Sequence, residues 1–178
     1  MLLTAIRMNL SSLTLLSIAI WPTYAQDHVL PEASYVCDVL NNLPAYRNKL
    51  ITIKGEWIRG EHGDVMKGQC TATLASDKHI WPNAISLEQT GLSRDQPTLT
   101  FRTDMESLRR AWATLARERL AGNAKPVTIT VEGWLQSPEA LLVTKTEPIR
   151  GNGFGHLSVY PARLLIRAVK SVTFDVGP

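Results

Sequence analysis

The chain has 178 residues, of which 44% are hydrophobic and 20% charged, with a formal net charge of +3. This length supports one domain, and the composition excludes a disordered or collagen-like chain. A charge so close to neutral argues against nucleic acid as a partner on electrostatic grounds alone.

Residues 1–25 have the pattern of a secretory signal peptide. One charged residue, Arg7, is followed by an apolar stretch that ends at Trp21 and by small residues at positions 23 and 25. The uninterrupted apolar stretch is shorter than the about 20 residues that span a bilayer. We expect cleavage after Ala25 and a single domain at 26–178, with 18 basic and 16 acidic side chains. An uncleaved anchor is the alternative. No later segment is long and apolar enough to span a membrane, so the expected location is periplasmic or secreted.

Cys37 and Cys70 are the two cysteines of the chain. In an exported protein they are most simply joined by a disulfide. This bridge would close a loop of 34 residues, and the chain-entropy model gives it a stabilising effect of about 3.8 kcal/mol. Free thiols and a bridge between two chains are the alternatives.

The first elements after residue 25 are a predicted helix and a predicted strand. Residues 31–42 carry apolar side chains at helical spacing, with Pro31 suited to the first turn and Pro44 just beyond the end. Residues 49–59 alternate between apolar and polar side chains, which predicts a strand, and Gly55 permits a sharp bend within it.

The middle of the chain is less regular. Gly60 and Gly63 predict a turn after the first strand, which makes a hairpin with the segment that follows. Shorter strands are expected within 65–76 and 80–89, and another extended segment at 98–103.

The clearest helix is predicted at 103–122. Thr103 is the expected N-cap and Glu106 completes a capping box, while Gly122 is placed as the C-cap. Glu106 also lies one turn before Arg110, which favours an ion pair between them. The predicted apolar stripe of this helix consists of Met105, Leu108, Trp112, Leu115 and Leu120.

The last third of the chain returns to strands. Residues 125–136 alternate and contain Gly133, and 140–146 are a candidate hairpin partner. Residues 161–174 predict a long final strand, with a helix in the first half as the alternative. Strands that bend at glycines around one amphipathic helix suit a small closed barrel, because closure leaves no exposed edge.

This order of elements resembles the oligonucleotide/oligosaccharide-binding (OB) barrel, whose helix lies between the third and fourth strands. The stretches LNNLPAYRNKLITIKGEW (40–57) and GFGHLSVYPARLLI (153–166) resemble exported bacterial proteins of unknown function with this barrel. The resemblance implies a mainly β (α+β) fold, a Greek-key barrel of about five strands, and an extra N-terminal helix. It implies no reaction.

Loops 61–64 and 153–156 are the candidate edges of a ligand groove, because loops carry such contacts. The side chains proposed to line it are His62, Trp81, Phe154 and His156. Trp81 lies before a proline in a predicted loop and could stack on a ligand, with core packing as the alternative. Trp57, Trp112 and Trp134 are interpreted as core residues.

The sequence has no serine in a nucleophile-elbow pattern, and its cysteines lack the paired short spacing of a zinc site. We therefore assign no catalytic residue, metal ligand or cofactor, and expect a non-catalytic binding module for a protein, a glycan or a small ligand. One alternative is a metal-assisted hydrolase built from His62, Asp64 and His156. The other is a barrel that binds single-stranded nucleic acid.

Overall fold

The computed structural model describes residues 32–60, 63–76, 78–92, 95–122, 126–143 and 151–174. All of them belong to one unit, residues 31–178, defined by its internal contacts. The predictions for residues 1–25 lie outside the described part of the chain. Among the described residues, no helix is both long enough and apolar enough to cross a membrane.

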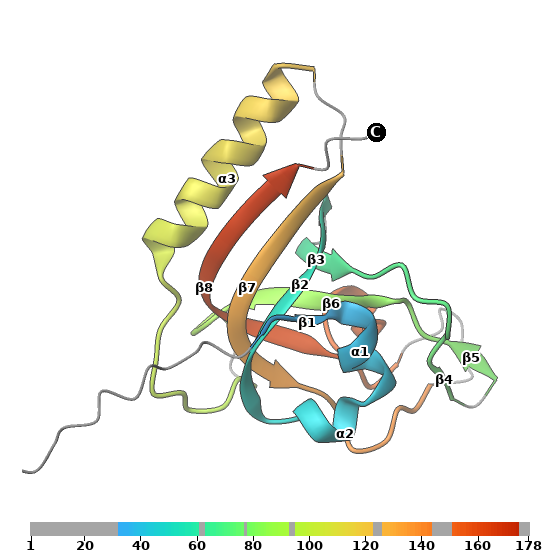
Figure 1. The fold of residues 1–178 in the computed structure, drawn as a ribbon. Helices are drawn as coiled ribbons and strands as arrows, with labels where there is room; N and C mark the ends of the chain where they lie inside the picture. Colours follow the sequence, from blue (N-terminus) through green and yellow to red (C-terminus); the bar gives the residue numbers. More distant parts are fainter. Residues whose placement is uncertain are drawn as a thin grey trace, which may run out of the picture. The chain divides into compact units, whose positions relative to one another are not determined.

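Five strands close into a barrel within the described residues (Figure 1). The barrel strands are β2 (Lys49–Gly60), β3 (Gly63–Lys67), β6 (Ala84–Gln89), β7 (Val127–Gln136) and β8 (Arg163–Phe174). Their order is β2-β3-β6-β8-β7, and β7 pairs back onto β2. The β6–β8 pairing is parallel and the others around the barrel are antiparallel. The α3 helix (Met105–Leu120) lies between β6 and β7 in the chain. This is the OB-like order, so the predicted fold class is confirmed.

The barrel closes because its long strands bend and change partners. The twelve residues of β2 pair with β7 over Lys49–Glu56 and with β3 over Glu56–Gly60. Along β7, the register against β8 shifts between Thr130 and Val131 and again just before Gly133. A Cβ at Gly133 would lie 2.6 Å from the carbonyl oxygen of Leu165, so only glycine lets the two strands approach this closely.

The barrel interior is filled by the inward side chains of its strands. Positions alternate along β7, where Ile129, Val131 and Leu135 are fully buried. The side chains of Ile53, Met66, Ile85 and Leu164 meet them from the other strands. The helix α3 adds Leu108 and Leu115 to the same core.

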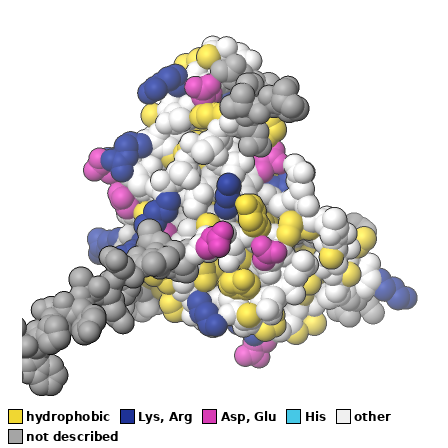
Figure 2. Space-filling view, viewed as in Figure 1, with side chains coloured by type: hydrophobic (Ala, Val, Ile, Leu, Met, Phe, Trp, Pro, Cys, Tyr) yellow, Lys and Arg dark blue, Asp and Glu magenta, His cyan; other side chains and the backbone are white. Residues whose placement is uncertain are grey.

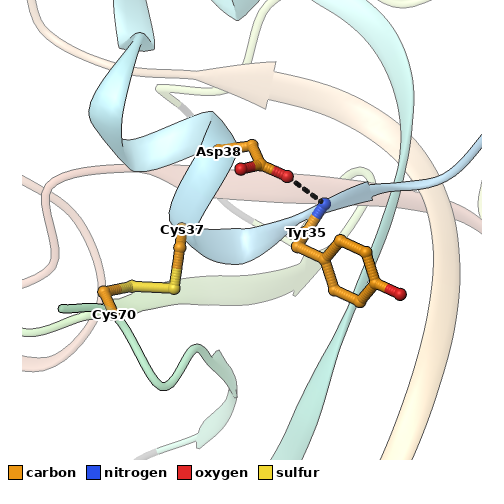
Figure 3. The surroundings of a disulfide bond; sticks show 4 residues. All are labelled: Tyr35, Cys37, Asp38 and Cys70. Carbon is orange, nitrogen blue, oxygen red and sulfur yellow. Dashed lines mark hydrogen bonds between the residues drawn. A yellow bond between two sulfur atoms is a disulfide. The ribbon is translucent and has the colours of Figure 1, made fainter.

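The N-terminal helix begins later than predicted. Residues Ser34–Tyr35 form β1, which pairs in parallel with Ile53 and Lys54 of β2. The helix α1 (Val36–Asn41) starts only after this pairing, and the Tyr35 N–H donates to the Asp38 carboxylate at 3.3 Å (Figure 3). The extension of the helix to Pro31 was wrong because β2 offers hydrogen-bond partners to the preceding residues, which a helix periodicity does not reveal.

The expectation that Pro44 ends the helical segment before β2 is only partly met. Pro44 lies in the first turn of a second short helix, α2 (Leu43–Tyr46), where a missing N–H costs nothing. Leu40 and Leu43 from the two helices are buried in the barrel core.

The Cys37–Cys70 disulfide is present, with the two Cα atoms 5.2 Å apart. It joins the start of α1 to the segment that follows β3 (Figure 3). The predicted hairpin also forms, since Gly60 pairs with Gly63 across the β2–β3 turn. The alternatives of free thiols and of a bridge between chains were therefore wrong.

The predicted extended segment at 98–103 is not a strand. At the end of this segment, hydrogen bonds to side chains replace the backbone bonds of a sheet. The Thr103 N–H donates to the Thr90 Oγ1 at 2.8 Å, and the Thr103 hydroxyl donates to the Ile166 carbonyl at 2.8 Å. Within the described parts of the chain, the short strands β4 (Ala75–Ser76) and β5 (His79–Ile80) pair with each other and with no other strand.

Asp104, and not Thr103, is the N-cap of α3. Its carboxylate accepts from the N–H groups of Glu106 and Ser107 at 3.0 and 3.1 Å. These bonds to backbone N–H groups, that of Ser107 first, lower the pKa of Asp104. The expected ion pair between Glu106 and Arg110 is present. Thr103 is unavailable as a cap because its hydroxyl bonds to β8.

Beyond the end of β6, the helix α3 replaces this strand as the hydrogen-bond partner of β8. The Asp104 N–H donates to the Arg167 carbonyl at 2.7 Å, and the Ser107 hydroxyl oxygen accepts from the Val169 N–H at 3.0 Å. Figure 1 shows the helix alongside this half of β8. The apolar stripe ends earlier than predicted, because Leu120 is 90% exposed.

The final segment is a strand from Arg163 to Phe174, so the helical alternative for its first half was wrong. The hairpin partner expected at 140–146 lies in the described chain only up to residue 143, where Val143 makes an isolated bridge to Gly151. The connection to β8 continues as an irregular loop with a 3₁₀ segment at His156–Ser158.

Candidate functional site

A hollow of about 360 Å³ lies between β3, β6 and the loop that leads into β8. We call it the β3–β6 groove, and its lining includes Gly63, Ser86, Glu88, Phe154, His156 and Arg163. The described residues of the two loops singled out from the sequence, around Gly63 and at 153–156, therefore meet in one hollow.

Arg163 lies at the base of the groove and is 3% exposed. Its Nε donates to the Gln136 amide oxygen at 2.7 Å, and its Nη1 donates to carboxylate oxygens of Glu88 and Asp95, both at 3.1 Å. A buried guanidinium must be paired in this way, because an isolated charge in the interior is very costly. These bonds fix the plane of the guanidinium, which lies 4.7 Å from the centre of the Phe154 ring.

The register of the sheet explains why these side chains meet. Ser86 on β6 pairs with Arg163 on β8, and Glu88 pairs with Leu165. On β6, Ser86 and Glu88 lie two residues apart and share the groove-facing side.

The loop over the groove holds an uncommon backbone conformation. Leu157 and Ser158 have φ values of 56° and 55°, a backbone region that residues other than Gly, Asn and Asp seldom adopt. The conformation is maintained by a small ladder, in which the N–H of Phe154 donates to the Tyr160 carbonyl at 2.8 Å and the reverse bond measures 3.1 Å. Such strain concentrates where a loop is shaped for a function.

Two of the four predicted groove residues are lining residues, namely Phe154 and His156. His62 lies outside the described residues. Trp81 is 1% exposed, and its indole N–H donates to the Ser76 hydroxyl at 2.8 Å. A Cβ on Gly151 would come within 2.3 Å of the Trp81 ring, so this tryptophan is packed against backbone and presents no face to a ligand. The alternative of core packing describes it correctly.

Asp64 lines a different hollow, of about 320 Å³, beneath α3. We call this hollow the α3 cavity, and its lining includes Asp64, Leu87, Leu92, Leu108, Trp112 and Ile166. The structure thus does not bring Asp64 and His156 into one hollow. Among the described residues, no group of three or more His, Cys, Asp or Glu side chains is placed to hold a metal ion. The hydrolase alternative also invokes His62, outside those residues, and stays a prediction.

The environment of Asp64 was not expected from the sequence. It lies two residues before the fully buried Met66 on β3, and its cross-strand neighbour on β6 is the buried Leu87. Strand alternation therefore gives this carboxylate an inward position. A charged residue in phase with core residues is the signal that could have identified it.

Three side chains surround the Asp64 carboxylate. Arg59, its cross-strand neighbour on β2, has its Nε 3.8 Å from the nearer oxygen, and its guanidinium lies 5.1 Å from the Trp112 ring centre. The Nε1 atoms of Trp57 and Trp112 are buried and make no hydrogen bond of normal geometry. Burial raises the pKa of Asp64, although Arg59 and the two indole N–H groups act in the opposite direction.

Comparisons with protein-family models, with curated proteins and with solved structures give no match for this chain. The assignment to the class of OB-like barrels rests on strand order and closure.

Proposed function

We propose that this protein is a binding module for a neutral, hydroxyl-rich ligand of the glycan class, held in the β3–β6 groove. The observation that carries the proposal is the groove itself, a hollow of about 360 Å³ where a phenylalanine ring adjoins a fixed guanidinium. OB barrels present their second and third strands and the loop before the fifth strand to oligonucleotides and oligosaccharides. In this barrel those parts are β3, β6 and the loop that carries Phe154.

The chemistry of the lining supports a glycan. Sugar hydroxyl groups donate and accept hydrogen bonds, and the groove offers carboxylate acceptors on Glu88 and Asp95 together with hydroxyls on Ser86 and Ser158. The ring of Phe154 supplies an apolar surface for the C–H face of a sugar. A few fixed polar groups around an apolar contact are typical of ligand sites.

The same lining argues against single-stranded nucleic acid. Arg163 is the only lysine or arginine among the described lining residues, and it is already bonded to two carboxylates. Phosphate groups would meet net negative charge there, whereas nucleic-acid binding depends on cations. Figure 2 shows positive and negative side chains interspersed on the face in view, with no extended basic patch.

The test is a titration of the purified protein with neutral oligosaccharides of several linkage types, followed by NMR of the backbone amides. We expect saturable shifts at residues 153–158 and on β6. Replacing Phe154 with alanine should weaken binding by at least about fivefold, the loss expected from one stacking contact of about 1–3 kcal/mol.

Phe101→Ala is the matched control, because Phe101 also lies beside an arginine, at 5.9 Å from Arg167, but lines another hollow. Equal losses in the two variants would contradict the proposal, as would the absence of any shift with every oligosaccharide. Retention of a single-stranded oligonucleotide that falls steeply with salt would favour nucleic acid instead.

We further propose that the protein is exported, to the periplasm or the exterior, after cleavage behind Ala25. The Cys37–Cys70 disulfide supports this, because disulfides persist in oxidising compartments. Intact mass and N-terminal sequencing of protein from its native host should place the first residue at Gln26. Recovery from the cytosol with residues 1–25 attached would contradict it.

A further inference from the structure

The α3 cavity is a second hollow with a chemistry distinct from that of the groove. Five of its lining side chains are apolar, namely those of Leu87, Leu92, Leu108, Trp112 and Ile166. Leu92 is 73% exposed, so the mouth of the cavity is apolar as well. The cavity therefore suits a ligand with an apolar body.

The charged groups in the described lining of this cavity are both negative. Its described lining contains Asp64 and Glu88 but no lysine or arginine. Glu88 is bonded to the buried Arg163, whereas the ion pair of Asp64 with Arg59 is loose, at 3.8 Å. The Arg59 side chain is 47% exposed, so it can turn into solvent at little cost. The cationic group of a ligand that enters the cavity would therefore meet the Asp64 carboxylate, whose ion pair with Arg59 is loose.

The two buried indole N–H groups are a second feature of this cluster. Trp57 and Trp112 interact with the Asp64 carboxylate, but neither Nε1 makes a hydrogen bond of normal geometry, and Trp57 is only 6% exposed. A buried donor without a well-formed hydrogen bond costs up to about 1–3 kcal/mol, and each such case in a folded protein requires an explanation. An ionised carboxylate has about four acceptor sites, enough for both indoles and an added cation.

We propose that the α3 cavity binds a small primary amine, with its ammonium group on Asp64 and its apolar tail along Leu108 and Ile166 toward the mouth at Leu92. The ammonium takes the place of the Arg59 guanidinium beside the Trp112 ring, where a cation also interacts favourably with the aromatic face. The Asp64 carboxylate then accepts from the ammonium and from the indole N–H groups together. This site adjoins the proposed glycan groove, with which it shares Gly63, Leu87 and Glu88, but its proposed ligand contacts Asp64, which does not line the groove. The failure of one proposal therefore leaves the other standing.

The test uses the purified protein and hexylammonium, with hexanol and hexanoate as probes of equal chain length. Binding is followed through the indole N–H resonances of Trp57 and Trp112. We expect hexylammonium to shift both resonances in a saturable way, hexanol to bind at least about tenfold more weakly, and hexanoate to give no saturable shift. This difference corresponds to one charge-assisted hydrogen bond.

Asp64→Asn keeps the shape of the side chain and removes its charge, so it should weaken hexylammonium binding at least about tenfold. Glu106→Gln is the matched control, since Glu106 is an exposed carboxylate at the start of the same helix that lines the cavity. Its affinity should equal that of the wild type. Hexanol binding as tightly as hexylammonium, or an unchanged affinity in Asp64→Asn, would overturn the proposal.

A second pair of variants avoids any dependence on how Asp64→Asn folds. Leu92 is an exposed residue at the mouth, so Leu92→Lys and Leu92→Glu remove the same apolar contact and differ from each other in the sign of the added charge. We expect hexylammonium to bind the glutamate variant more tightly than the lysine variant, by at least about fourfold. Equal effects of the two substitutions would also overturn the proposal.

Discussion

The disulfide provides the sharpest quantitative prediction for this fold. Cys37 and Cys70 are separated by 33 positions, and the chain-entropy model assigns such a loop about 3.8 kcal/mol at 25 °C. Replacing both cysteines with alanine should therefore lower the free energy of unfolding by about that amount. For a chain of this size, the melting temperature should fall by about 8–15 °C.

The bridge should contribute close to the full value, because the chain-entropy model assigns its effect to the freedom of the unfolded chain and not to contacts of the folded one. It connects α1 to the segment beyond β3, and neither cysteine belongs to a barrel strand. Urea unfolding followed by tryptophan fluorescence gives the measurement. The wild type in reducing buffer serves as the internal comparison, since it should unfold at the same urea concentration as the double variant.

Two results would refute this reasoning. A difference below about 1 kcal/mol between oxidised wild type and the double variant would mean that the unfolded chain gains no freedom when the bridge is lost. Two alkylatable thiols in the unreduced protein would show that the bridge does not form at all.

Three further predictions concern single residues. Gly68→Ala places a Cβ 2.7 Å from the Cys37 sulfur, so it should lower the free energy of unfolding by about 1–3 kcal/mol. Calorimetry should find a smaller loss when the same substitution is made in the variant without cysteines. Arg163→Met leaves the Glu88 carboxylate without its donor and should cost about 2–3 kcal/mol in urea unfolding; a neutral effect would contradict the pairing described above. Burial raises the pKa of Asp64, so its stabilising contribution is complete below the ordinary value of 3.8 and is lost as the pH rises through the folded-state pKa. The stability of Asp64→Asn relative to the wild type should therefore increase from pH 3 to pH 7, and a constant difference would contradict it.

The sequence by itself determined the elements whose signals are local. Alternation over 49–59 and 125–136 predicted β2 and β7, and the helical stripe of 103–122 predicted α3. The pair of cysteines predicted the disulfide, because two cysteines allow one bridge within a chain. The order of these elements was enough to indicate a closed barrel.

Element ends were decided by tertiary contacts. Asp104 caps α3 in place of Thr103, because the Thr103 hydroxyl is bonded to the Ile166 carbonyl on β8. The N-terminal helix begins later than predicted because Ser34 pairs with Ile53 on β2. Neither partner is near in sequence, so a local pattern contains no information about them.

The two candidate sites depended even more on the tertiary structure. Phe154 and His156 were expected at a groove, but nothing in the sequence singled out Arg163. It becomes the base of the groove because β6 and β8 pair in parallel with Ser86 opposite Arg163, a register fixed only when the barrel closes. In the same way, Asp64 on β3 meets one indole from β2, that of Trp57, and one from α3, that of Trp112. The periodicity of the sequence predicts which side chains share a face of a strand or helix. The closure of the barrel determines which other side chains that face contacts.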